Sequence, residues 1–145
     1  MAKILTVALA LTMTVSAAVK IEKTAWKGWP NCYRISNGEV ELIVTSDVGP
    51  RVMRYAFIGG QNLLKEYADQ LGKSGEKDFQ LRGGHRIWVA PETLATSWAP
   101  ENVPVKIEIS GDTLTATEPV EPSTGVQKQM IVKLAATGSE VELIH

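Results

Sequence analysis

The sequence contains a single cysteine, Cys32, and only two histidines among its 145 residues. One cysteine excludes a disulfide within the chain, so stability must come from an apolar core. One cysteine and two distant histidines also lack the ligand spacing of a zinc site, and we expect neither a metal nor a cofactor. Because Cys32 lies close to Trp29 and Tyr33, we expect it to be a small buried apolar side chain.

Neither sign of charge is in excess. The chain has 15 Lys and Arg against 16 Asp and Glu, which gives a formal net charge of -1. No basic stripe alternates with aromatic residues, so nothing in the sequence favours nucleic acid as a partner. The hydrophobic content of 44% and the charged content of 21% are those of a globular protein, and the length predicts one domain.

Long apolar runs are also missing, and none could span a bilayer. Residues 4–15 form the longest run; Lys3 precedes it, and Ser16, Ala17 and Ala18 follow it. A basic start, an apolar segment and small exit residues are typical of a signal peptide. Residues 1–18 are therefore predicted to be cleaved near Ala18, which implies a secreted or periplasmic protein without stable membrane insertion after cleavage. A buried first strand or a membrane anchor is the alternative.

No stretch of the chain shows a sustained helical period, and turn signals return roughly every ten residues. We expect strands over residues 32–35, 39–45, 51–58, 79–90, 103–109, 113–117, 126–134 and 140–145. Residues 62–67 fit either a strand or a helical turn. Residues 68–78 are expected to be a mobile surface loop and 91–100 a second loop. This pattern predicts an all-β fold, an antiparallel β-sandwich.

The last strand reaches His145 without a turn, a cap or a polar tail. A sheet that ended in the middle of a strand would leave an open edge and uncovered apolar surface. We therefore expect residues 19–145 to be the N-terminal part of a larger sandwich domain that is truncated at its C-terminus.

Residues 80–92 hold the densest set of binding groups. Strand alternation would turn Phe79, Leu81, His85, Ile87 and Val89 to the core, and Gln80, Arg82, Arg86, Trp88 and Ala90 to the other side. Two guanidinium groups and an indole ring suit a sugar, because they offer donors for hydroxyls and a flat apolar face for a pyranose. The candidate substrate-binding residues are Arg82, Arg86 and Trp88. His85 joins them if a bulge at Gly83-Gly84 turns it towards the arginines.

Each of these residues also has a structural interpretation. Arg82 and Arg86 could be surface residues paired with Glu92 or Glu101. Arginines in a site could equally hold a carboxylate or a phosphate. Trp88 could be half-buried packing, and the histidine a hydrogen-bonded core residue. No residue is assigned a catalytic role.

The segment 83–92, which reads Gly-Gly-His-Arg-Ile-Trp-Val-Ala-Pro-Glu, is the strongest of several motifs that occur in order with 46–52, 62–64, 98–102 and 124–128. Together they resemble a bacterial family of aldose 1-epimerase-like (galactose mutarotase-like) proteins over nearly all of residues 19–145. The resemblance implies a large antiparallel β-supersandwich with a concave sheet that binds carbohydrate, and a substrate-orienting role for Arg82 or Arg86. In mutarotases a histidine and a glutamate act as general acid and base. The glutamate is expected beyond residue 145.

The leading hypothesis is an exported carbohydrate-binding, mutarotase-like domain whose partner is a small-molecule carbohydrate. One alternative is an aldose 1-epimerase whose acid and base residues lie beyond residue 145. Another is a structural β-module of a cell-surface assembly. Salt bridges that lock both Arg82 and Arg86 would favour this alternative.

Overall fold

The computed structural model describes residues 18–145. The predicted signal peptide, residues 1–18, lies outside the described residues except for its last position and stays a prediction. The described part folds into nine β-strands in two antiparallel sheets and has no helix. It accordingly contains no helix that could cross a membrane.

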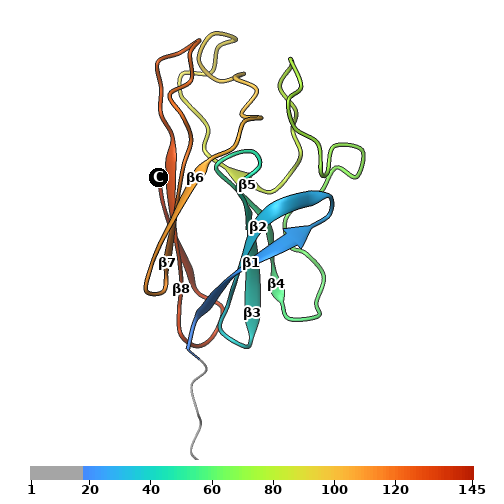
Figure 1. Ribbon diagram of the computed structural model, residues 1–145, viewed down its shortest axis with the longest axis vertical. Coiled ribbons are helices and arrows are strands. Elements are labelled where there is room, and N and C mark those ends of the chain that lie inside the picture. Colours follow the sequence, from blue (N-terminus) through green and yellow to red (C-terminus); the bar gives the residue numbers. More distant parts are fainter. Residues whose placement is uncertain (1–17) are drawn as a thin grey trace, which may run out of the picture.

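Both sheets are meanders in which each strand pairs with the next one along the chain. The first contains β1 (Lys20–Trp26), β2 (Trp29–Ser36), β3 (Val40–Thr45), β4 (Arg51–Phe57) and β5 (His85–Arg86). The second contains β6 (Lys106–Ser110), β7 (Thr113–Thr117), β8 (Gln129–Leu134) and β9 (Val141–Ile144). Figure 1 shows the two sheets as facing layers, with β1 to β5 in blue to yellow-green and β6 to β9 in orange to red. The predicted all-β antiparallel sandwich is confirmed.

The main core lies between the sheets because alternate residues of each strand point to the same side. Buried members come from both layers: Ile35, Val40, Leu42, Val44 and Val52 from the first, and Leu114, Ala116, Met130, Val132 and Leu134 from the second. Burial of such apolar surface stabilises a fold by about 25 cal/mol per Å². The hairpin turns expected at 36–38, 110–112 and 137–139 are found where β2 meets β3, β6 meets β7 and β8 meets β9.

A second core covers the opposite face of the first sheet, although the alternation of residues 39–45 indicated only one buried face. It consists of Trp29, Cys32, Ile43, Val48 and Met53. The predicted surface loop 68–78 closes this core: Leu71 packs against it, and the indole nitrogen of Trp29 donates to the carbonyl of Lys73 at 3.0 Å. The loop is therefore anchored to the sheet. Cys32 is buried as expected, and burial raises the pKa of its thiol to about 11.

The expected strand over residues 79–90 is wrong, because only His85 and Arg86 form a strand there. Arg82, Gly83 and Gly84 have φ values of 51°, 90° and 73°, a left-handed geometry that interrupts pairing. A Cβ on Gly83 would lie 1.9 Å from the carbonyl oxygen of Lys65. The glycine pair thus lets the chain pass close to its own backbone. The alternation that assigned the side chains of this segment to two faces does not apply.

Candidate functional site

The connection between β5 and β6 and the later part of the connection between β4 and β5 extend beyond one end of the two sheets (Figure 1, upper end, green to yellow). They bring two features together at this end. One is a buried group of charged side chains, and the other is a set of partly exposed aromatic rings beside a pocket.

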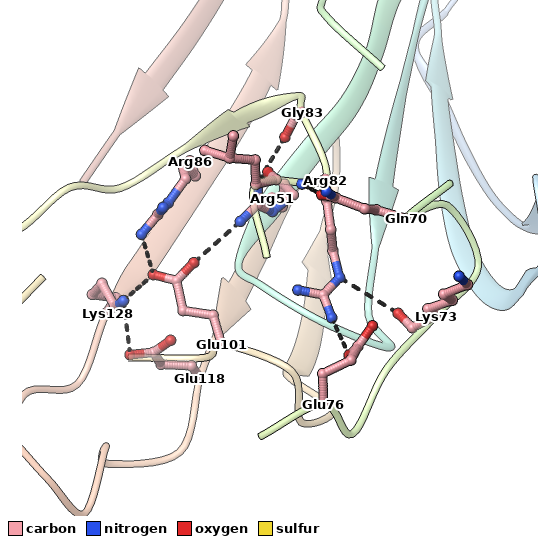
Figure 2. Close-up of polar contacts among 11 residues, drawn as sticks. Arg51, Gln70, Lys73, Glu76, Arg82, Gly83, Arg86, Glu101, Glu118 and Lys128 are labelled. Atoms are coloured by element: carbon pink, nitrogen blue, oxygen red, sulfur yellow. Dashed lines mark hydrogen bonds and ion pairs between the residues drawn. The ribbon is translucent and has the colours of Figure 1, made fainter. Parts of the chain in front are cut away.

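We call the buried side chains of Arg51, Arg86, Glu101, Glu118 and Lys128 the charge cluster. Glu101 lies at its centre (Figure 2). One carboxylate oxygen accepts a hydrogen bond from Arg51 at 3.2 Å; the other accepts one from Arg86 at 3.2 Å and one from Lys128. Three cations thus share one carboxylate.

The charge cluster joins the two sheets. Arg51 begins β4 and lies directly opposite Arg86 on β5, so two like charges are cross-strand neighbours that Glu101 compensates. Glu118 follows β7 and Lys128 precedes β8, and the backbone N–H of Glu118 donates to the carbonyl of Lys128 at 3.0 Å. The side chain of Glu101 is 2% exposed and that of Arg51 is 1% exposed. Charges this deeply buried require partners, and here they find them across the sandwich.

The cluster contains one group that titrates near neutral pH. Burial raises the pKa of Glu118 to about 7, an effect that Glu101 adds to and Lys128 opposes. The Lys128 ammonium lies 3.6 Å from the Glu118 carboxylate, too far for a hydrogen bond, and Oε1 of Glu118 is buried without a hydrogen-bond partner. Burial also lowers the pKa of Arg51 to about 10, and the neighbouring Glu101 carboxylate partly opposes this by raising it. Arg51 remains charged at pH 7.

Arg82 is fully buried, and its guanidinium group points away from Glu101 towards Glu76 and Lys73 (Figure 2). Its guanidinium group pairs with Glu76 and donates to the carbonyl of Lys73 at 3.4 Å, while its backbone N–H donates to Gln70 at 2.7 Å. All three partners belong to the loop 68–78. Arg82 therefore holds this loop against the sheet, and its side chain does not reach the surface where a ligand would bind.

Arg86 and Trp88 lie together, but they stack on each other instead of facing a ligand side by side. The Arg86 guanidinium lies 4.2 Å from the centre of the Trp88 ring and 4.4 Å from that of Phe79, both within cation–π distance. Its side chain is only 12% exposed. Arg86 thus supports Trp88 from within, and Trp88 itself remains 39% exposed.

His85 lies neither in the core nor beside the arginines. Its Nε2 is 3.0 Å from Nε2 of His145, with the rings 18° from parallel. At this distance one nitrogen donates and the other accepts, which requires a neutral acceptor ring. Burial and then the neighbouring His145 lower the pKa of His85. The pair connects the short strand β5 with the residue that follows β9.

The aromatic rings of Phe79, Trp88 and Trp98 pack edge to face. Their centres are 5.2 Å apart for Phe79 and Trp98 and 5.6 Å apart for Trp88 and Trp98. Phe79 and Trp98 line a pocket of about 480 Å³, together with Leu94, which is 85% exposed. We call it the aromatic pocket. Asp78 also lines it and supplies polar groups near the rings.

Of the residues at this end of the molecule, Arg86 and Trp88 were predicted from the sequence as binding residues, whereas Trp98, Glu101 and Glu118 were not. A tryptophan within the expected loop 91–100 was the available signal for Trp98. The expected alternative of an Arg86–Glu101 pair is found, although the pair is buried and not at the surface. Nothing in the sequence indicated that Glu101 would also collect Arg51 and Lys128, since its partners come from three different strands or their ends.

No three His, Cys, Asp or Glu side chains within residues 18–145 are grouped as a metal site would require. Comparison of the chain with protein-family models, curated proteins and solved structures gave no match.

Proposed function

We propose that this protein binds carbohydrate in the aromatic pocket at the loop end of the sandwich. The observation that carries the proposal is Trp98, which is 39% exposed and lines the pocket with Phe79. An indole ring offers a flat apolar surface to the C–H groups of a sugar ring. Asp78 and Ser123 on the pocket wall provide acceptors and a hydroxyl for the sugar hydroxyls.

The buried charges support the same site from behind. Glu101 holds Arg86, and Arg86 in turn lies over the rings of Phe79 and Trp88. Aromatic side chains fixed in this way lose little freedom when a ligand binds, which favours affinity. The resemblance of residues 83–92 to aldose 1-epimerase-like proteins points to the same class of ligand. Export is part of this proposal, and intact-mass measurement of the secreted protein tests cleavage near Ala18.

Isothermal titration against a panel of neutral hexoses, pentoses and acidic sugars tests carbohydrate binding. Trp98→Ala is expected to weaken binding about tenfold, because it removes the exposed stacking surface. Phe57→Ala is the matched control: Phe57 is also an exposed aromatic residue, 62% accessible at the end of β4, and it does not line the pocket. Absence of binding to every sugar, or equal affinity of parent and Trp98→Ala, would remove the proposal.

A second candidate function is a structural β-module of a cell-surface assembly. Arg82 pairs with Glu76 and Arg86 pairs with Glu101, so both arginines are held in internal salt bridges. This observation supports a structural role for the two arginines. This function predicts no sugar binding by the parent protein. The same titration panel therefore separates the two candidates.

A further inference from the structure

A second pocket adjoins the aromatic pocket. It has a volume of about 290 Å³, and Glu101, Glu118, Val103 and Val120 are among its lining residues. We call it the glutamate pocket. Pro100 lines both pockets. The segments 98–103 and 118–123 each contribute residues to both of them.

Exposed apolar side chains are concentrated along these two pockets. Leu94 and Trp98 line the aromatic pocket, and Val103 and Val120, which are 48% and 55% exposed, line the glutamate pocket. Apolar side chains that a folded protein leaves exposed next to one another mark a binding surface more often than isolated ones do. Their distribution over both pockets indicates a ligand that extends beyond Trp98.

We propose that the ligand is a neutral oligosaccharide, with one sugar unit on Trp98 in the aromatic pocket and the next unit in the glutamate pocket. This inference rests on the proposed function and adds the chain length and the charge of the sugar. A ligand confined to one pocket would leave Val103 and Val120 exposed, whereas a second sugar unit covers them.

The chemistry of the glutamate pocket selects hydroxyl groups over anions. Both carboxylate oxygens of Glu101 are already occupied by cations. Glu118 lies behind the wall as well, because its Oε1 is buried and 3.6 Å from the Lys128 ammonium. The polar side chains of this pocket that remain partly exposed are Asn102 and Glu121. A hydroxyl both donates and accepts, and therefore fits the carboxylate of Glu121 and the amide of Asn102. The carboxylate of an acidic sugar would instead meet the like charge of Glu121, because the cations of the charge cluster are directed to Glu101 and Glu118.

Isothermal titration of the intact chain with matched series tests this inference. The three series are built from glucose, xylose and galactose. Each contains the neutral monosaccharide, its α- or β-linked disaccharide and its tetrasaccharide, and the corresponding uronic acids are measured beside them. The neutral disaccharide is expected to bind at least about tenfold more tightly than its monosaccharide, because it covers the second pocket as well. The uronic acids are expected to bind more weakly than the neutral sugars.

Val120→Trp fills the glutamate pocket from an exposed position, and is expected to reduce disaccharide affinity to that of the monosaccharide. Ile109→Trp is the matched control, since Ile109 is 47% exposed on β6 and does not line either pocket. Glu121→Gln keeps the shape of a side chain that lines the glutamate pocket, and it is expected to relieve the discrimination against uronic acids while the preference for the disaccharide remains.

Equal affinities for the monosaccharide and the disaccharide would overturn the inference, and so would a chain-length preference that persists in Val120→Trp. Tighter binding of uronic acids would overturn the assignment of a neutral ligand. Each of these outcomes leaves binding that Trp98→Ala weakens, so the proposed function would stand. Failure to bind any sugar removes the proposed function itself.

Discussion

Replacing Glu101 by glutamine tests whether the charge cluster fastens the two sheets. The change leaves the shape of the side chain but removes the charge that Arg51, Arg86 and Lys128 share. A glutamine offers one acceptor oxygen, and its NH2 group would face a cation. Loss of one partner from a buried ion pair costs about 3–5 kcal/mol, because the remaining charges stay buried without compensation. That is a large share of the roughly 5–15 kcal/mol that stabilises a typical domain.

Urea unfolding followed by tryptophan fluorescence measures this loss, and the slope of the transition should not change. Glu108→Gln is the matched control because its ion pair with Lys106 is exposed, with side-chain exposures of 57% and 69%. We expect that control to lose less than about 1 kcal/mol. If Glu101→Gln lost no more than the control, the charge cluster would not hold the sheets together.

Three further predictions follow from buried or strained positions. Burial raises the pKa of Glu118 from 4.5 to about 7. Between these two pH values the folded chain binds this proton and the unfolded chain does not, so the free energy of unfolding falls with rising pH, by at most about 1.4 kcal/mol per pH unit. Urea titrations at several pH values should show this slope, and Glu118→Gln should flatten it; an unchanged slope contradicts the assignment. Gly83→Ala should lower the free energy of unfolding by at least about 2 kcal/mol, measured by thermal unfolding, because the new Cβ would lie 1.9 Å from the Lys65 carbonyl oxygen. Gly111→Ala is the control, because a Cβ there meets open space, and equal losses in the two variants would refute the clash. Cys32 should resist a thiol reagent at pH 8 until urea unfolds the chain, because burial raises its pKa to about 11, and rapid labelling of the folded protein would contradict this.

The sequence by itself determined the all-β class and most of the strands. Val40, Leu42 and Val44 alternate with Glu39, Glu41 and Ile43, which is close to a strict two-residue period. The Asn37-Gly38 turn before them can adopt the positive φ that a tight hairpin requires. These signals are local, since each depends on residues within a few positions of one another. For the same reason the hairpins of β2 with β3, β6 with β7 and β8 with β9 were predicted where the structure has them. The strand β1 and its hairpin with β2 were not predicted.

The site was decided only by the tertiary structure. The left-handed backbone at Gly83 and Gly84 ends the expected strand, because two other backbone segments pass too close for a side chain there. Local alternation therefore placed Arg82 towards a ligand, while the fold buries it against Glu76. Glu101 gains its role from cations on distant strands.

The aromatic pocket shows the same division. Trp88 belonged to a segment whose composition already indicated binding, but the rings that line the pocket are those of Phe79 and of Trp98, which lies in a separate loop. Composition determined which chemical groups the chain could offer, whereas their meeting at one end of the sandwich depends on how the two sheets pack. That packing brings residues far apart in the sequence to within a few ångströms, and no short-range pattern encodes it.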